Sequence, residues 1–151
     1  MAERDGVDNR IYQIGEVADL VHLSLRTLRH WDEVGLVRPS GRSTGGFRLY
    51  TDSDVELLLL AKSMKPLDFS LDEMRELLGL RVVLADPSAG ADERAAATER
   101  LAMFTAVADE RCARLAEQLD GARALAGSLR TDWGAASDDP PAGADEAAGR
   151  P

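Results

Sequence analysis

Two short helical segments follow one another near the start of the chain. Residues 14–20 place apolar side chains at the i, i+3 and i+4 spacing of a short amphipathic helix. Residues 21–23 then form a turn, and Ser24 is a favourable N-cap for a second helix over residues 25–34. Gly35 follows, a residue type that readily adopts the positive φ at which helices end. The pattern predicts a helix-turn-helix.

The second of these helices has two chemically different faces. At about 100° per residue, Leu25, Leu28 and Trp31 fall on one face, which suits anchoring to a core. The other face is rich in Arg, His and Thr, residue types that reach base edges and phosphates from the major groove. The DNA-contacting residues predicted here, with the N-cap included, are Ser24, Arg26, Thr27, Arg29 and His30. From this helix alone, a surface helix whose arginines are simply hydrated remains an equal alternative.

The glycine-rich stretch after this helix favours DNA binding. Residues 37–50 have the pattern of two short strands around a turn whose glycines supply positive φ. Arg42 and Arg48 flank the turn, where they can contact phosphates, and Phe47 completes the predicted wing contacts. Phe47 and Tyr50 fall on opposite faces of the second strand, so one of them packs inward, and the pattern leaves open which. A glycine-rich loop can also bind nucleotide phosphates, but no Gly-Lys-Ser/Thr sequence follows here.

Two further helices are predicted to complete this unit. Thr51 is placed to cap a helix that continues to about Lys65 and offers apolar side chains to a core. Ser70 and Glu73 form a capping box at the start of the next helix. After that helix, Asp86-Pro87 interrupts the helical pattern.

A long segment rich in Ala, Leu, Glu and Arg follows over residues 92–133. Its apolar side chains form a seam with a period of about 3.5 residues. A solitary helix of this length cannot bury such a seam, so we expect a partner helix; packing back onto its own domain is the alternative. The residues predicted to form a dimer interface are Leu101, Phe104, Ala108, Cys112, Leu115, Leu119, Ala122, Ala126 and Leu129.

The predicted fold class is mostly α: a winged helix-turn-helix domain, a long dimerisation helix and a disordered tail. The tail is rich in Pro, Gly and Asp and low in bulky apolar groups, which is typical of disorder. The predicted parts are a flexible N-terminus (1–10), a DNA-binding domain (11–80), a connector (81–91), a dimerisation helix (92–133) and the tail (134–151).

The charge of the chain supports DNA binding only weakly. The formal net charge is −9, which at first argues against a nucleic-acid partner. Residues 11–50 hold five arginines against four acids, whereas residues 81–151 hold eight arginines against thirteen acids. The acidity therefore lies mostly away from the predicted reading surface, although no basic stripe marks that surface either.

Five short blocks across about seventy residues resemble the DNA-binding domain of the MerR family of bacterial transcription regulators. In their order along the chain, the blocks are Ile14-Gly15-Glu16-Val17-Ala18, Thr27-Leu28-Arg29, Gly35-Leu36, Gly46-Phe47-Arg48-Leu49-Tyr50 and Phe69-Ser70-Leu71. The sequence departs from the family where the first turn usually carries a glycine and where a Tyr pair usually follows the arginine, here His30-Trp31. The base preference is therefore not carried over.

The resemblance implies a homodimer in which the long helices of two copies pair antiparallel as a coiled coil. It also implies a short, effector-domain-lacking regulator that binds double-stranded DNA in a promoter spacer, bends and untwists it, and acts with RNA polymerase. A structural or nucleoid-associated DNA-binding protein of the same fold, without an inducer, is the alternative. The two hypotheses differ in where the protein binds: a regulator binds at promoters, whereas a structural protein binds at many sites.

Catalytic and metal chemistry find little support in the composition. Two histidines, one cysteine and no clustered acid–base pair argue against an enzyme, and no cofactor or metal is predicted. Cys112 has no other Cys or His nearby in sequence, so we expect a small interface residue; a metal bridged by two subunits is the alternative. No apolar run approaches the ~20 residues of a membrane span, and a cytoplasmic location is expected.

Overall fold

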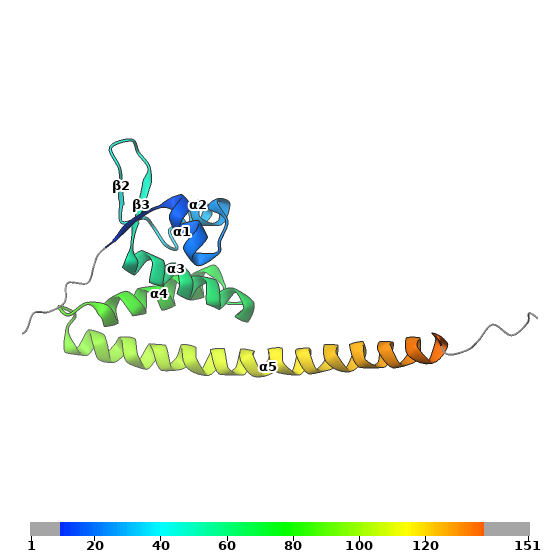
Figure 1. Ribbon diagram of the computed structural model, residues 1–151. Coiled ribbons are helices and arrows are strands. Elements are labelled where there is room, and N and C mark those ends of the chain that lie inside the picture. The colour runs from blue at the N-terminus through cyan, green and yellow to red at the C-terminus, as the bar shows by residue number, and fades with distance from the viewer. Residues whose placement is uncertain (1–9, 138–151) are drawn as a thin grey trace, which may run out of the picture. The chain divides into compact units, whose positions relative to one another are not determined.

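The computed structural model describes residues 10–137, with side chains as far as residue 134. The chain divides into two compact units, residues 1–109 and 110–151. The fold is mostly α-helical, as predicted, with a small sheet near the N-terminus (Figure 1). The elements are β1 (Ile11–Gln13), α1 (Ile14–Val21), α2 (Leu25–Glu33), β2 (Gly41–Arg42), β3 (Arg48–Thr51), α3 (Asp52–Met64), a 3-10 turn (Lys65–Leu67), α4 (Leu71–Ala85) and α5 (Ala91–Ser137).

The predicted helix-turn-helix is confirmed by α1 and α2. His22 ends α1 in the left-handed conformation, with φ 52°, at the turn where a glycine was missing from the sequence. Ser24 caps α2: its Oγ accepts a hydrogen bond from the backbone N of Thr27 at 3.0 Å. Gly35 follows the end of α2 with φ 69°.

Three short strands form an antiparallel sheet in the order β1-β3-β2. The hairpin of β2 and β3 was predicted, and Arg42 lies opposite Arg48 in its register. Strand β1 was not predicted; its Tyr12 pairs with Tyr50 of β3. The Tyr12 hydroxyl also donates a hydrogen bond of 2.8 Å to Asp52, which raises the pKa of the tyrosine. Strand β1 therefore ties the start of the domain to the start of α3.

One apolar core joins the helices and the sheet of residues 10–109. Its buried residues include Val17, Val21, Leu28, Trp31, Leu36, Val37, Tyr50, Leu58, Ala61, Met64, Met74, Leu77, Leu78 and Phe104. Capping boxes at Thr51 and Ser70 fix the starts of α3 and α4. The core holds α2 and the hairpin in place on the same unit.

The first turns of α5 belong to this core. Phe104 is 7% exposed, and its ring lies 6.1 Å from that of Phe69. Leu101 packs against the same cluster. Arg100 forms an ion pair with Glu76 of α4, and this contact lowers the pKa of the carboxyl. Leu101 and Phe104, which we expected between two copies, thus pack within the chain, so the alternative of packing onto its own domain describes this part of the helix.

Two helices extend further than the sequence suggested. Helix α4 continues through Ala85, so residues 81–85 of the expected connector are helical. The helix ends before Asp86, whose extended backbone (ψ 113°) suits a residue that precedes proline. Helix α5 continues from Ala91 to Ser137, four residues past Trp133, because one glycine costs only about 1 kcal/mol against alanine. Residues 1–9 of the predicted flexible N-terminus (1–10) and the rest of the predicted tail, 138–151, lie outside the described residues.

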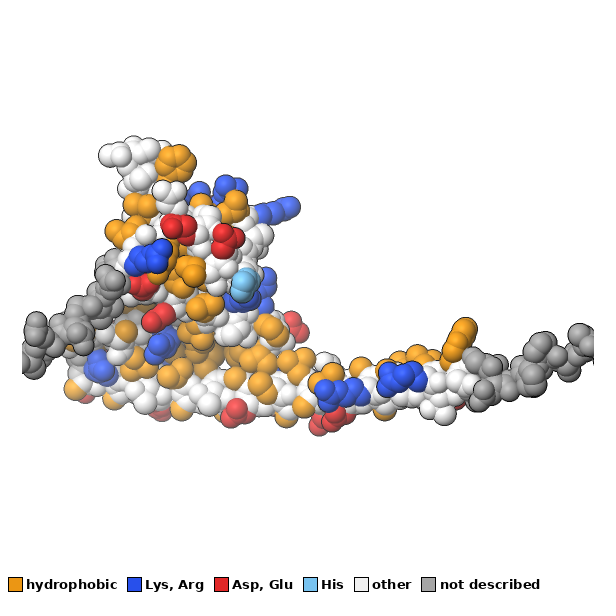
Figure 2. Space-filling view, viewed as in Figure 1, with side chains coloured by type: hydrophobic (Ala, Val, Ile, Leu, Met, Phe, Trp, Pro, Cys, Tyr) orange, Lys and Arg blue, Asp and Glu red, His pale blue; other side chains and the backbone are white. Residues whose placement is uncertain are grey.

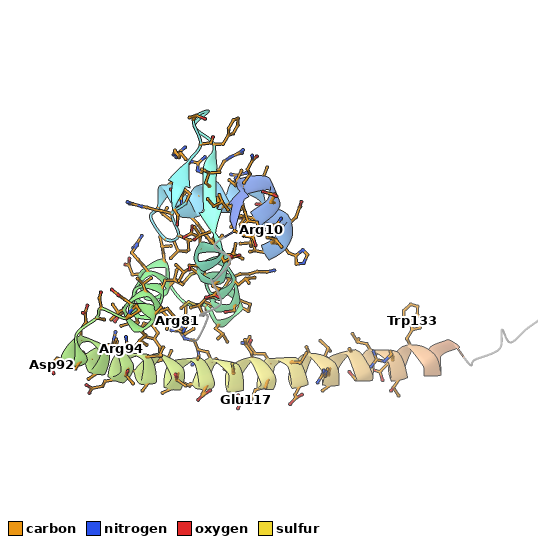
Figure 3. The ribbon with its side chains drawn as sticks, turned by 60° about the vertical axis from the view of Figure 1, so that its left-hand side comes forward. Arg10, Arg81, Asp92, Arg94, Glu117 and Trp133 are labelled. Atoms are coloured by element: carbon orange, nitrogen blue, oxygen red, sulfur yellow. The ribbon has the colours of Figure 1, made fainter. Side chains whose placement is uncertain are left out.

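The part of α5 after Asp109 is a single helix with apolar side chains at its surface. Leu115, Leu119, Leu125 and Leu129 are between 40% and 61% exposed. Glu117 and Trp133 project from different sides of the helix (Figure 3). Cys112 is an exposed free thiol.

Two other kinds of feature are absent from residues 10–137. None of the helices there combines the length and the apolar character needed to span a membrane. That part of the chain also contains no group of three or more His, Cys, Asp or Glu side chains arranged to hold a metal ion.

Candidate nucleic-acid interface

Helix α2 is held by its inner face and by both of its ends. Leu28 is fully buried and Trp31 is 5% exposed, whereas Leu25, expected on the same face, is 39% exposed. At the C-terminal end, Arg75 of α4 donates a hydrogen bond of 2.7 Å to the carbonyl of Val34. This bond satisfies a carbonyl that a helix end would otherwise leave without a partner. The helix is therefore fixed on its domain with its opposite face outward.

The outward face carries the reading residues predicted from the sequence. Arg26, Arg29 and His30 are exposed, and Thr27 is half-buried beside its cap, Ser24. Within the described part of the chain, the side chains of Arg26, Arg29 and His30 form no hydrogen bond or ion pair. Together with neighbours from α2 and the 3-10 turn they line one open hollow: Arg26, Thr27, Arg29, His30, Trp31, Glu33 and Lys65. The amino group of Lys65 lies 5.8 Å above the ring of Trp31.

The hairpin of β2 and β3 forms the predicted wing. Its tip is closed by a hydrogen bond of 2.9 Å from the backbone N of Gly46 to the carbonyl of Ser43, and Gly46 has φ 80°. Phe47 is 65% exposed at the tip, whereas Tyr50 is fully buried, which answers the question that the sequence left open. Side chains of Lys and Arg gather beside the wing, over α2 (Figure 2). An exposed aromatic ring and basic groups thus lie next to the outward face of α2.

An acidic residue that the sequence analysis did not single out joins the wing to α2. Asp32 of α2 accepts a hydrogen bond of 2.7 Å from the Nε of Arg48, and its carboxylate lies 3.7 Å from the guanidinium of Arg42. Arg42 also donates to the carbonyl of Gly46 at 3.1 Å. The Arg48 side chain is 22% exposed and its pKa is raised, first of all by the hydrogen bond to Asp32. The sequence alone does not reveal this contact, because a single acidic residue within a helix gives no indication of a partner so far along the chain.

Two polar groups of the unit are directed toward its interior, the half-buried Lys62 and the fully buried Tyr50. The amino group of Lys62 on α3 donates a hydrogen bond of 2.8 Å to the carbonyl of Val21, so it closes the C-terminal end of α1. The hydroxyl of Tyr50 is buried with no hydrogen-bond partner among the described residues, and burial raises its pKa. The Tyr50 hydroxyl is therefore not placed to meet a ligand at the surface.

Residues 12–80 match the family described as MerR HTH family regulatory protein. These residues form a MerR-family DNA-binding domain. The match covers β1 through most of α4, so it contains α2, the wing and the ion pairs of Asp32. The resemblance found from the short sequence blocks is therefore confirmed.

The curated relatives are MerR-type regulators that share the DNA-binding region. HTH-type transcriptional activator mta of Bacillus subtilis is 42% identical over 67 residues, which are 44% of this chain and 26% of that protein. HTH-type transcriptional regulator ZntR of Escherichia coli is 38% identical over 72 residues, which are 48% of this chain and 51% of that protein. The chain thus matches between about a quarter and a half of each relative. These relatives are transcription regulators, in agreement with the prediction that the chain is not an enzyme.

One solved structure resembles the chain over most of its length. HiNmlR, described as a MerR family regulator lacking the sensor domain and bound to promoter DNA, has a TM-score of 0.64 and 25% sequence identity. The similarity covers 85% of this chain and 95% of that one. The similarity therefore extends beyond residues 12–80 into α5.

Proposed function

We propose that this MerR-family chain is a DNA-binding transcription regulator. Helix α2 reads the bases of the operator, and the wing contacts the flanking sugar-phosphate backbone. The observation that carries the proposal is the outward face of α2, where Arg26, Arg29 and His30 are exposed and unpaired within the described chain. Arginine can bond guanine with two hydrogen bonds, and histidine and threonine can reach base edges or phosphates. The domain match to regulators such as ZntR supports this assignment.

The wing supplies the proposed contacts to the sugar-phosphate backbone. Arg42, Phe47 and Arg48 lie on the hairpin next to α2, and Phe47 is largely exposed. Contacts to phosphates fix the register and orientation of a protein on the duplex, whereas contacts to base edges give specificity. We therefore assign positioning to the wing and sequence reading to α2.

The second part of the proposal is that two copies pair through α5. The leucines after Asp109 lie on the exposed helix surface, and Leu115, Leu119 and Leu129 recur at the spacing of a coiled-coil seam. Burying these side chains against a partner helix removes apolar surface from water, at about 25 cal/mol per Å². The proposed interface is Ala108, Cys112, Leu115, Leu119, Ala122, Ala126 and Leu129, with the antiparallel arrangement of the family.

A dimer of this kind places two α2 helices in successive turns of the major groove. In the proposed mechanism the dimer binds a promoter spacer, bends and untwists it, and so lets RNA polymerase engage both promoter elements. The structural neighbour HiNmlR is itself described as bound to promoter DNA. Bending a DNA site of about 20–30 base pairs costs on the order of 1–6 kcal/mol. Phosphate contacts from both copies offset this cost.

Sequence-specific DNA binding can be tested in two steps. Genomic fragments bound by the purified chain are selected first, and their affinity is then titrated at several salt concentrations. We expect a small set of fragments that lie between promoter elements, and affinity that falls steeply with salt. Arg29→Gln should weaken binding to the selected site, whereas the matched Arg123→Gln on α5 should not. If no fragment is enriched, the proposal is wrong. If fragments from the whole genome are enriched uniformly, a structural DNA-binding protein is favoured instead.

Sedimentation of the purified chain tests the pairing. We expect a dimer for the unchanged chain and a shift toward monomer for Leu119→Glu, which places a charge in the apolar seam. The matched control Gln118→Glu introduces the same residue one position away, outside the seam. If both variants sediment like the unchanged chain, the proposed interface is wrong.

A further inference from the structure

We propose that Asp32 is a positioning residue of the DNA interface, whose negative charge strengthens DNA binding because it holds the wing arginines in place. The inference rests on the proposed function, since it concerns the same surface. It runs against the simple electrostatic expectation, in which a carboxylate near the phosphate backbone repels DNA and weakens binding.

The geometry places Asp32 between the reading helix and the wing. Its carboxylate receives the Nε of Arg48 at 2.7 Å and lies 3.7 Å from the guanidinium of Arg42. The Asp32 side chain is only 15% exposed, so solvent screens these ion pairs less than those on the open surface. The two arginines come from opposite strands of the hairpin, where they face each other in register. One carboxylate therefore binds both strands of the wing to α2.

The hydrogen bonds of Arg48 leave it able to bind an anion. Within the described part of the chain its Nε donates to Asp32, and no other hydrogen bond of this guanidinium is present. Its two terminal amino groups therefore keep their donors for a phosphate, while the Nε contact fixes the plane of the group. Arginine presents five donors in a rigid fork, so one edge can hold a carboxylate while the other receives a second anion.

Fixing this side chain before binding removes an entropic cost from the complex. Immobilising a flexible side chain at an interface costs about 0.5–1.5 kcal/mol, which corresponds to about a 2- to 12-fold change in affinity. Because Asp32 already orders the Arg48 side chain in the free protein, this entropic cost does not have to be met when DNA binds. Asp32→Asn should therefore weaken binding to the selected site by about 2- to 12-fold.

A double-mutant cycle separates this role from simple repulsion and from a purely structural role. In an Arg48→Gln background, Asp32→Asn should weaken binding by less than about twofold, because only the more distant Arg42 remains to be held. The matched control is Asp19→Asn, which makes the same substitution on α1, at an exposed side chain with no hydrogen bond or ion pair among the described residues. That variant should bind the same or more tightly, as repulsion alone requires.

Binding is measured for all variants on the same fragment, with thermal unfolding to compare their folding. If Asp32→Asn binds as tightly as the unchanged chain or more tightly, the inference is wrong. Equal weakening with and without Arg48 also overturns it, since Asp32 would then act through something else. If the unchanged chain binds no fragment, the proposed function itself fails, which is a different result.

A second measurement needs no variant and so does not depend on whether Asp32→Asn folds. The Nε–H resonance of Arg48 in the ¹⁵N-labelled chain should be protected from solvent exchange in the free protein and stay so in the DNA complex. Loss of that protection on DNA binding would mean that Arg48 leaves Asp32 for the phosphates. The carboxylate would then compete with DNA, and the inference would be overturned.

Discussion

Replacing Phe104 by alanine tests whether the first turns of α5 belong to the core of the DNA-binding unit. The ring is 7% exposed and lies 6.1 Å from that of Phe69, with the guanidinium of Arg100 5.3 Å from its centre. Truncating a buried phenylalanine costs about 3–5 kcal/mol. Because the ring keeps a small exposed edge, we expect Phe104→Ala to lower the free energy of unfolding by about 3 kcal/mol.

Urea unfolding followed by circular dichroism measures this loss, with Met103→Ala as the matched control. Met103 is the preceding residue of the same helix and is 56% exposed, so its truncation should cost about 1 kcal/mol or less. The measurement is made at two protein concentrations, because unfolding of a dimer depends on concentration. Similar losses for the two variants would refute the assignment of Phe104 to the core. A loss that vanishes at high concentration would instead place Phe104 between two copies.

Three further predictions concern stability. Tyr50→Phe removes a buried hydroxyl without a partner among the described residues, so urea unfolding should show unchanged or higher stability; a loss above about 1 kcal/mol would reveal a missed hydrogen bond. Ser24→Ala removes the N-cap of α2 and should cost about 1 kcal/mol in the same assay. Arg100 lowers the pKa of Glu76, so their contact stabilises the fold above the ordinary carboxyl pKa and is lost as the pH falls through the lowered value. Arg100→Gln should therefore flatten the acid limb of the stability profile, and an unchanged limb would contradict the assignment.

Local signals in the sequence were sufficient for the helix-turn-helix. Ser24 and Gly35 act within one or two turns of the backbone that they cap, so their residue types already mark the ends of α2. The wing was predictable for the same reason, since its glycines have a local conformational role. Which of Phe47 and Tyr50 packs inward depends on the rest of the core, and no pattern within a four-residue strand contains that information.

Contacts between distant residues escaped prediction. The ion pair of Asp32 and Arg48 joins residues sixteen positions apart through the packing of a helix against a hairpin. Strand β1 has only three residues, and its role follows from pairing with β3, not from its own alternation. Phe104 lies on the apolar seam of α5, yet the periodicity that placed it there does not say which surface covers each part of the seam.

The ion pairs between α2 and the hairpin have a consequence for building hybrid regulators. Exchanging α2 alone between two relatives would bring in a new residue at position 32 while the arginines at 42 and 48 stayed behind. A graft of that kind would separate charges that are matched here, and it would alter the hairpin along with the sequence preference. The interchangeable segment in this protein therefore extends from Ser24 to Thr51, with the reading helix and the wing transferred together.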